Sequence, residues 1–311
     1  MKIVFLDVKS IGEDIDLSGY DKLGTVEKYD FTSPLEVPER TVDADVIIVN
    51  KVPINANTVG QSKKLKLVCV TATGTDNLDK EYLKNAGMAW RNVAGYSTQT
   101  VAQHTFALLF YLLEKLNYYD NYVKEEKYMN DHVFTHFDNV FHELYGQTWG
   151  IVGMGAIGQR VAEIATIFGC SIIYYSTSGK NKGQNYENVD FDTLLTRSDI
   201  ISIHAPLNEQ TERLMDKTAF EKMKKSAIFL NLGRGPIVAE EDLADALEHE
   251  MIAAAGLDVL CKEPMSPDNP LRRVKDSNKL IITPHIAWAS LEARIRLMDI
   301  ILEQIKAFDA W

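Results

Sequence analysis

The stretch QTWGIVGMGAIGQRVAEIATIFGCSIIYYS, residues 147–176, decides how this chain folds. A strand pattern at 148–152 leads into three closely spaced glycines and then into a helix pattern over 159–168, whose apolar residues recur on one face. A second apolar, β-rich run occupies 171–175. The order strand, glycine turn, helix and strand predicts a βαβ unit, and thus an α/β protein with parallel strands.

The three glycines stand at G-x-G-x-x-G spacing, which suits a dinucleotide. Gly153 permits a sharp turn, Gly155 lets the backbone approach a pyrophosphate, and Gly158 lets helix and strand pack closely. The first N–H groups and the dipole of the following helix then face the diphosphate. The alternative is an α/β turn that needs glycine only for packing, but the strand before and the helix after favour dinucleotide binding.

The end of the second strand leaves the cofactor open between NAD(H) and NADP(H). Sites of this type usually carry an acidic residue there, which binds the ribose. Here Ser176 and Thr177 occupy that place, and Lys180 and Lys182 lie close by. The lysines could hold a 2'-phosphate, or Ser176 could hydrogen-bond the ribose while the lysines are merely solvated.

Length and composition indicate a two-domain globular protein. The chain has 311 residues, 46% of them hydrophobic and 25% charged. Its net charge of -11 argues against nucleic acid or an anionic membrane as the main partner. We expect a cytoplasmic protein, because residues 1–6 lack a signal-peptide pattern and the longest apolar run, 106–113, is too short to span a membrane.

The three cysteines, Cys69, Cys170 and Cys261, are far apart and lack metal-binding spacing. We expect them to be reduced core thiols. His132, His136 and His142 are loosely spaced without acidic or cysteine partners, so we expect surface or packing residues and no metal site.

The first part of the chain predicts a small α/β domain. Strand patterns cover 2–8, 44–50 and 65–71, with helical segments between them. The turn at 71–79 follows the third strand, where backbone N–H groups at Thr73 and Gly74 could hold a small anion. The alternative is a helix cap formed by Asp76 or Asn77.

A helix with a very apolar body is predicted at 97–115, buried on several sides, with His104 as a structural histidine. Beyond the βαβ unit, four further strand patterns each end in a polar or special residue: 199–203, 226–231, 253–259 and 280–283. They predict a doubly wound parallel sheet of about six strands. Ser290 should cap a last amphipathic helix, 291–308.

Three polar side chains follow successive strands and could meet at one edge of this sheet. Arg234 is a fixed cation that could hold a substrate carboxylate, and His285 could protonate a developing alkoxide. Glu263 could orient the histidine ring. Each residue also has a structural alternative: Arg234 as a turn residue, His285 as a packed loop residue and Glu263 as a helix cap. Together, however, the three favour a reductase of 2-keto acids.

The motifs TATGTDNLD, STQTVAQH, GMGAIGQ, HAPLNEQT, NLGRG, LDVLCKEP and TPHIAW occur in this order. Through these motifs and their order, the chain resembles the D-isomer-specific 2-hydroxyacid dehydrogenase family along almost its whole length. The resemblance implies a flavodoxin-like catalytic domain at 1–96 and 288–311, and an inserted Rossmann-like dinucleotide-binding domain at 97–287. It also implies a substrate site between the domains and a homodimer.

The resemblance also implies roles for individual residues. Arg234, Glu263 and His285 would form the catalytic triad, and Thr73 and Gly74 would bind the substrate carboxylate. Further residues would contact the cofactor: Ala156 and Ile157 at the diphosphate, Ser176, His204, Ala205 and Pro206 at the adenosine half, Leu232 and Gly233 along the groove, and Asp258 near the nicotinamide.

Within the family, TPHIAWASLEARIRLM is most similar to the glycerate dehydrogenase and hydroxypyruvate reductase branch. Trp288 could wall the substrate pocket, or merely pack at the hinge. We therefore expect hydride transfer between NAD(P)H and hydroxypyruvate, giving D-glycerate. The alternatives are a reductase of glyoxylate or of 2-keto acids in general, and, in another class, a nicotinamide-sensing corepressor-like protein. Glu263 speaks against a formate dehydrogenase, which has glutamine beside its histidine.

Overall fold

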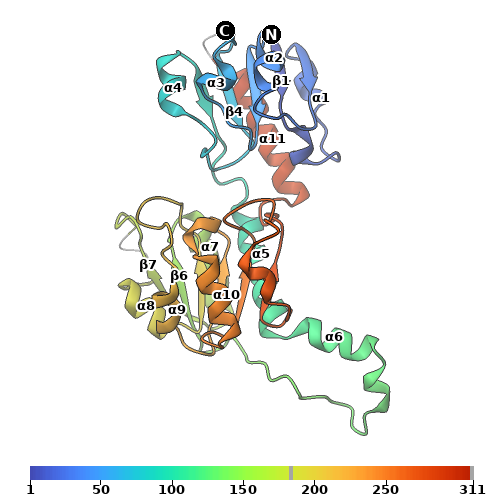
Figure 1. Cartoon of the computed structure of the whole chain (residues 1–311), viewed down its shortest axis with the longest axis vertical. Coiled ribbons are helices and arrows are strands. Elements are labelled where there is room, and N and C mark those ends of the chain that lie inside the picture. Colours follow the sequence, from blue (N-terminus) through green and yellow to red (C-terminus); the bar gives the residue numbers. More distant parts are fainter. Residues whose placement is uncertain (182–184, 309–311) are drawn as a thin grey trace. The chain divides into compact units, whose positions relative to one another are not determined.

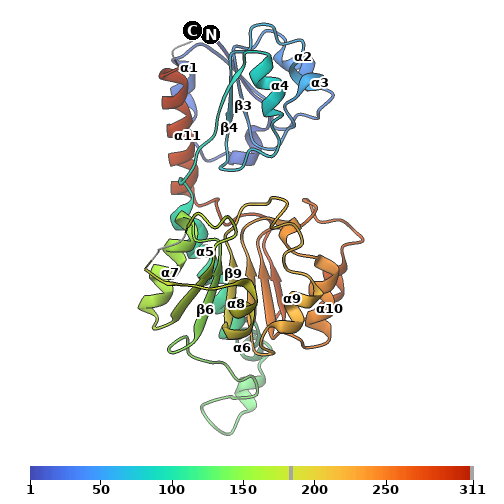
Figure 2. The same cartoon turned by 90° about the vertical axis from the view of Figure 1, so that its left-hand side faces the viewer.

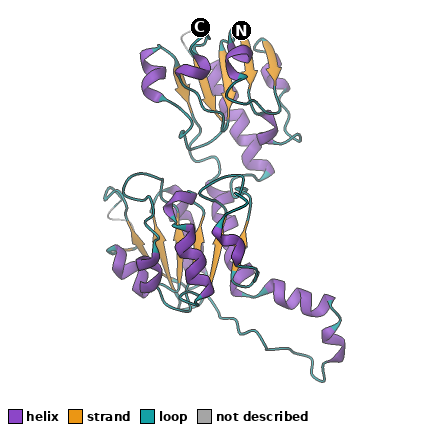
Figure 3. Cartoon of the chain, in the orientation of Figure 1, coloured by secondary structure: helices purple, strands orange, loops and turns teal. Residues whose placement is uncertain are grey.

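The computed structural model describes residues 1–181 and 185–308, and the chain divides into two compact units (Figures 1 and 2). Unit 1 comprises Met1–Ser97 and Trp288–Trp311, and unit 2 comprises Thr98–Ala287. Both are α/β structures with parallel sheets, which confirms the predicted fold class (Figure 3). No helix in the described part of the chain is long and apolar enough to cross a membrane.

The described part of unit 1 forms a five-stranded parallel sheet in the order β2-β1-β3-β4-β5, the order of flavodoxin-like folds. Its strands are β1 (Lys2–Phe5), β2 (Thr25–Lys28), β3 (Val46–Val49), β4 (Leu67–Val70) and β5 (Ala89–Arg91). The three central strands were predicted. The edge strands β2 and β5 were missed because they are short and partly exposed, so they lack a continuous apolar run.

Alternate residues of the central strands supply two separate cores. On β3, Val46 and Ile48 pack on one face, whereas Ile47 and Val49 pack on the other. The first face is covered by α1 (Ser18–Asp21) and α11 (Leu291–Lys306), and the second by α2 (Val37–Thr41), α3 (Ala56–Val59) and α4 (Lys80–Asn85). Since both faces are buried, the strands read as continuous apolar runs.

One predicted helix cap is confirmed and another is wrong. Ser290 Oγ accepts a hydrogen bond from the backbone N–H of Ala293 at 3.3 Å and caps α11, as predicted. Helix α4 is capped by Asp79, whose Oδ1 accepts from the N–H of Tyr82 at 2.9 Å. The expected cap at Asp76 or Asn77 was therefore wrong by one turn.

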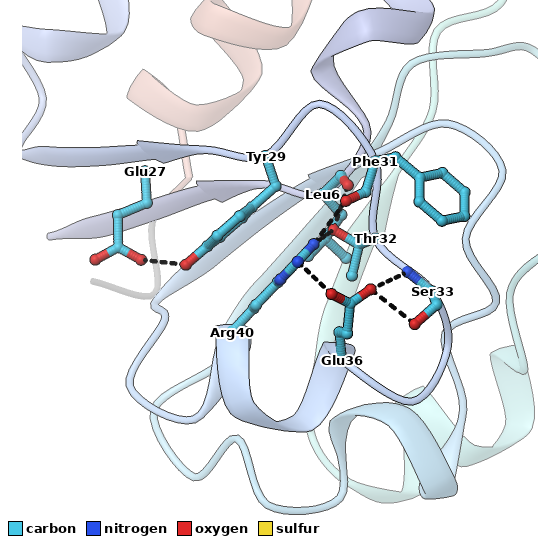
Figure 4. A network of polar contacts seen from close by, with 8 residues as sticks. All are labelled: Leu6, Glu27, Tyr29, Phe31, Thr32, Ser33, Glu36 and Arg40. Carbon is cyan, nitrogen blue, oxygen red and sulfur yellow. Dashed lines mark hydrogen bonds and ion pairs between the residues drawn. The ribbon is translucent and has the colours of Figure 1, made fainter.

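A polar network ties α2 to the carboxyl ends of β1 and β2 (Figure 4). The Arg40 guanidinium lies 4.2 Å from the ring centroid of Tyr29, and its Nη1 donates to the carbonyl of Phe31 at 2.6 Å and to Thr32 Oγ1 at 2.7 Å. Glu36 pairs with Arg40 and accepts two hydrogen bonds from Ser33. The loop after β2 is thus held without contribution from its exposed Phe31 side chain.

Within the described residues, unit 2 has a seven-stranded parallel sheet in the order β12-β11-β10-β9-β6-β7-β8. Its strands are β6 (Thr148–Val152), β7 (Ser171–Tyr175), β8 (Glu187–Asn188), β9 (Ile200–Ile203), β10 (Ile228–Asn231), β11 (Ala254–Leu257) and β12 (Leu280–Ile282). The predicted βαβ unit is confirmed as β6, α7 (Ala156–Ile167) and β7. The two-residue β8 was not predicted, because it is exposed and carries no apolar signal.

Helices cover both faces of this sheet. One face packs against α8 (Phe191–Arg197), α9 (Lys217–Lys222) and α10 (Glu240–Glu248), and the other against α5 (Thr98–Leu113) and α7. The ring centroids of Phe106 on α5 and Trp149 on β6 are 5.0 Å apart. On β11, a Cβ at Gly256 would lie 3.2 Å from Leu108 Cβ, so glycine lets α5 approach the sheet closely.

A segment projects from the rest of unit 2 (Figures 1 and 2). Many of its apolar side chains are exposed. It consists of α6 (Leu116–Lys124), the 3₁₀ helix η2 (Lys127–Asn130) and the loop to residue 145, and we call it the arm. Helix α6 was not predicted. His136 stacks on Tyr122 at 3.7 Å between ring centroids, whereas His132 and His142 are exposed, in line with packing and surface roles.

Three short 3₁₀ helices complete the described elements: η1 (Val8–Ile11), η3 (Gly235–Ile237) and η4 (Pro270–Arg273). All three cysteines are free. Cys69 and Cys170 are buried, but Cys261 is exposed, so the expectation of a core thiol was wrong for Cys261. It lies in the irregular segment after β11, beyond the sheet that buries its neighbours.

Candidate active site

Most of the predicted site residues of unit 2 lie at the carboxyl edge of its sheet. Gly153, Ser176 and His204 follow β6, β7 and β9. Arg234 follows β10, Asp258 and Glu263 follow β11, and His285 follows β12. Because all the strands are parallel, the sheet order separates a cofactor-like half on β9, β6 and β7 from a chemical half on β10, β11 and β12.

The glycine turn has the close contacts that its spacing predicts. Gly153 has φ 93°, and a Cβ there would lie 2.7 Å from the backbone nitrogen of Ala205. A Cβ at Gly158 would lie 2.2 Å from the Gly153 carbonyl oxygen. At Gly155, a Cβ would meet no further atom of the described residues within 4 Å. Ala156 and Ile157 form the first turn of α7, beside this open surface.

The ends of β7 and β9 carry buried polar atoms without partners. Among the described residues, neither Ser176 Oγ nor His204 Nδ1 has a hydrogen-bond partner. His204 Nε2 lies 3.0 Å from Ser202 Oγ, and burial lowers the pKa of His204 to about 3. The ring is therefore neutral, and a ligand with hydroxyl groups would satisfy both atoms.

These observations fit a dinucleotide. The strands β9, β6 and β7 are neighbours in the sheet, so three features lie at adjacent strand ends. They are the open space over Gly155, the first turn of α7, and the unsatisfied atoms Ser176 Oγ and His204 Nδ1. Ala205 is buried beside Gly153, and Pro206 is exposed. Thr177 is half-buried and Lys180 is exposed, whereas Lys182 lies outside the described residues.

Arg234 stands on a turn that a buried asparagine braces. The fully buried Asn231 accepts from the N–H of Gly233 at 3.1 Å and donates to the carbonyl of Arg234 at 3.0 Å. Leu232 and Gly233 are buried within the same turn. Sequence reasoning did not single out Asn231, although a polar residue that ends an apolar strand run was a usable signal.

Glu263 and His285 form an ion pair when the histidine is protonated. His285 Nδ1 lies 2.7 Å from Glu263 Oε2, and the backbone N–H of Leu260 donates to Glu263 Oε1 at 3.0 Å. The chain around Glu263 is not helical, so its alternative role as a helix cap does not apply. The hydrogen bond at Nδ1 leaves Nε2 of His285 as the ring atom able to exchange a proton with a substrate.

The buried Asp258 carboxylate holds the loop that carries His285. It accepts from Thr283 Oγ1 at 2.6 Å, from the N–H of Ile286 at 2.9 Å and from the N–H of Ala287 at 2.8 Å. The N–H of His285 donates to the Asp258 carbonyl at 2.8 Å, and His285 itself has φ 55°. Three charge-assisted bonds thus offset an uncommon left-handed conformation.

His104 extends this arrangement onto α5. Its Nε2 lies 2.9 Å from Thr283 Oγ1 and 3.6 Å from Asp258 Oδ1. Burial lowers the pKa of His104, and the Asp258 charge opposes that shift. Thr283 was missed by sequence reasoning, because no local pattern shows that a strand-end threonine bonds to a residue on the preceding strand. These contacts agree with the structural role expected for His104.

The predicted substrate residues Thr73, Gly74 and Trp288 belong to unit 1. Thr73 Oγ1 donates to the carbonyl of Val93 at 3.0 Å, and its own carbonyl accepts from Asn92 Nδ2 at 2.6 Å. In residues 1–181 and 185–308, no acceptor pairs with the N–H of Thr73 or Gly74. Trp288 packs edge-on against Tyr96, with ring centroids 6.3 Å apart.

Comparison with known proteins decides the family. Residues 106–287 match the family model of the D-isomer specific 2-hydroxyacid dehydrogenase NAD binding domain. The chain belongs to this family. It is 38% identical to the hydroxypyruvate reductase of Blautia hydrogenotrophica over 99% of this chain and 97% of that protein. It is also 36% identical to the glycerate dehydrogenase of Methylorubrum extorquens over 99% and 96%.

A solved structure shares the fold. An acyclic imino acid reductase in complex with NADPH and D-Arg superposes with a TM-score of 0.86 at 31% identity, covering 99% of this chain and 96% of that chain. The protein is therefore a D-2-hydroxyacid dehydrogenase, an oxidoreductase with a nicotinamide dinucleotide cofactor. The individual roles predicted for the site residues remain predictions.

Proposed function

We propose that this D-2-hydroxyacid dehydrogenase interconverts hydroxypyruvate and D-glycerate. The observation that carries the proposal is the 2.7 Å pair of Glu263 and His285, which follow β11 and β12, while Arg234 follows the neighbouring strand β10. The two relatives named above, a hydroxypyruvate reductase and a glycerate dehydrogenase, support the choice of substrate. Glyoxylate is the main competing substrate.

In the reductive direction, each residue of the triad has a separate task. Arg234 binds the substrate carboxylate with its planar guanidinium and orients the keto group. His285 Nε2 donates a proton to the keto oxygen as it becomes an alkoxide, and Glu263 stabilises the charged ring through Nδ1. When bound, the reduced nicotinamide supplies the hydride to C2. In the oxidative direction, His285 Nε2 takes the hydroxyl proton.

We assign the substrate carboxylate to the N–H groups of Thr73 and Gly74 as well. Because hydrogen bonds hold both the hydroxyl and the carbonyl of Thr73, the turn is rigid and its N–H groups are preorganised for an anion. Trp288 would limit the size of the substrate side chain. Its packing against Tyr96 supports a fixed ring position.

We further propose that both NADH and NADPH serve as cofactor. No carboxylate stands at residues 176–181, after the end of β7, so nothing there repels a 2'-phosphate. Ser176 would hydrogen-bond the ribose, and Lys180 would face the phosphate. The family model names NAD, whereas the imino acid reductase binds NADPH, and both are compatible with this strand end.

We also propose a homodimer that is formed in part by the arm. Phe134, Phe137 and Val140 are 87%, 76% and 72% exposed, which is unusual for a monomeric surface. A second copy of the chain would bury them. Three free cysteines support the cytoplasm, a reducing compartment, as its location.

The test is turnover by the purified protein, followed as loss of NADH or NADPH absorbance with hydroxypyruvate, glyoxylate, pyruvate and a branched 2-keto acid. We expect the highest kcat/KM with hydroxypyruvate. A higher value with glyoxylate would overturn the proposed substrate. Binding of cofactor without turnover of any keto acid would favour a sensing role over an enzyme.

A further inference from the structure

A pocket lies beside α4 and β5 at the edge of the unit 1 sheet. Its volume is about 640 Å³. It is lined by Lys80, Lys84, Met88, Ala89, Trp90, Arg91 and Asn92. Of these residues, only Asn92 touches a residue assigned to the proposed reaction, because its Nδ2 donates to the carbonyl of Thr73.

The charge of this pocket is strongly one-sided. Lys80 and Lys84 stand at i and i+4 on α4, where two like charges repel each other, and Arg91 adds a third cation. No carboxylate lines the pocket, and none of the three cations forms an ion pair with a described residue. Although the chain has a net charge of -11, this pocket is thus lined by three cations and no carboxylate.

The pocket wall is fixed rather than loose. Trp90 packs against the apolar core of unit 1, and the ammonium of Lys80 lies 5.4 Å from the centroid of its ring. Arg91 Nη1 donates to the carbonyl of Trp90 at 2.9 Å, which orients the guanidinium. Lys80 and Arg91 are therefore partly ordered before any ligand arrives, which lowers the entropic cost of binding.

The edge strand adds a backbone donor. In a parallel pair, alternate residues of a strand bond to its neighbour. The N–H of Ala89 donates to the carbonyl of Lys66 beside β4, so the N–H of Trp90 points to the open side of β5. Cations on two elements and one backbone N–H together match a ligand that carries several anionic oxygens.

We propose that this pocket is a binding site for a small polyanion that carries two or more carboxylate or phosphate groups. A monoanion the size of the proposed keto acid substrates could neutralise only one of the three cations. The site is thus separate in chemistry from the proposed catalytic site, where Arg234 takes a single carboxylate.

Titration calorimetry on the full chain tests this proposal, with citrate and pyrophosphate as probes and acetate as a monoanion control at matched ionic strength. The protein carries Arg234→Gln, which weakens carboxylate binding at the proposed catalytic site, and it is saturated with NADH, which occupies the diphosphate site at the glycine turn. We expect one bound citrate or pyrophosphate per chain and no measurable binding of acetate. The two probes distinguish a polycarboxylate from a phosphate ligand.

Adding Lys84→Gln and Arg91→Gln should weaken binding by about tenfold or more. The matched control, Lys63→Gln with Lys64→Gln, makes the same charge change on exposed lysines of unit 1 outside the pocket. Equal weakening by both pairs, or no binding of either probe, would overturn the proposal. In an otherwise unchanged chain, the Lys84 and Arg91 variants should keep keto acid turnover. A failure of polyanion binding is therefore distinguishable from a failure of the proposed reaction.

Discussion

His285 Nδ1 lies 2.7 Å from Glu263 Oε2, although the two residues are 22 positions apart in the chain. The carboxylate is itself held by the N–H of Leu260, so the ring orientation is set by a short segment after β11. This leaves Nε2 for the substrate.

His285→Ala should lower kcat by about 10² to 10⁴-fold, because the proton donor is lost. Glu263→Gln keeps a hydrogen-bond acceptor for Nδ1 but loses the charge, so its kcat should fall less. Steady-state kinetics measure both, and cofactor affinity from fluorescence titration should stay nearly unchanged. Unchanged turnover of His285→Ala would refute the assigned mechanism.

Asp258→Asn should both destabilise the protein and slow turnover. An amide cannot accept from all of the Thr283 hydroxyl and the N–H groups of Ile286 and Ala287, so at least one buried donor loses its partner. We expect a loss of about 2–3 kcal/mol of unfolding free energy, against about 1 kcal/mol for Thr283→Val.

Denaturant unfolding and kcat measure these effects. A fall in kcat with unchanged stability would mean that Asp258 acts on the cofactor or substrate directly and does not position the His285 loop.

His204 should make the protein less stable in acid. Burial lowers its pKa from 6.5 to about 3, so between these values the unfolded chain binds a proton that the folded chain excludes. Stability is full above pH 6.5 and falls toward pH 3 by up to about 1.4 kcal/mol per pH unit from this group.

His204→Asn should reduce the pH dependence of the unfolding free energy between pH 3 and pH 6.5, measured without cofactor. His249→Asn, on the surface of unit 2, serves as the control. An unchanged profile in His204→Asn would show that other groups cause the acid sensitivity.

Ser176→Asp should convert dual cofactor use into a preference for NADH. A carboxylate there would accept from the ribose hydroxyls but repel a 2'-phosphate, so kcat/KM with NADPH should fall on the order of tenfold or more. The matched control is Ser178→Asp, at an exposed position on the same loop. An equal loss with both cofactors would place the ribose elsewhere.

Replacing Phe134 and Phe137 by serine should shift the protein from dimer to monomer, because the arm loses its largest exposed apolar side chains. Light scattering coupled to gel filtration gives the mass. Phe31 and Leu35 are 71% and 92% exposed on unit 1, and their replacement by serine should leave the mass unchanged. A monomeric unmodified protein would refute the proposed dimer.

Much of the fold could be predicted because its signals are local. The strands β6 and β7 were predicted with their observed bounds, since both are buried runs that flank a glycine turn. The edge strand β5 was missed because its side chains are partly exposed. Helix α6 was missed because its aromatic and polar residues pack within the arm and supply no buried residue to a core.

The candidate site, too, could be predicted only in part. Strand-end positions predicted that Arg234, Glu263 and His285 follow neighbouring strands, because the carboxyl ends of parallel strands lie at one edge. The bracing of the Arg234 turn by Asn231 and the link from His104 to Thr283 could not be predicted. They depend on side-chain directions that no periodicity encodes.

The sequence by itself determined the α/β class, the dinucleotide turn and the family, because glycine spacing and buried strand runs act over a few residues. Only the tertiary structure decided that the Asp258 carboxylate holds the His285 loop across 28 and 29 positions and that Glu263 meets the His285 ring. The physical reason is strand order. Placing β11 next to β12 brings distant residues within hydrogen-bond distance, and that pairing is a property of the whole sheet.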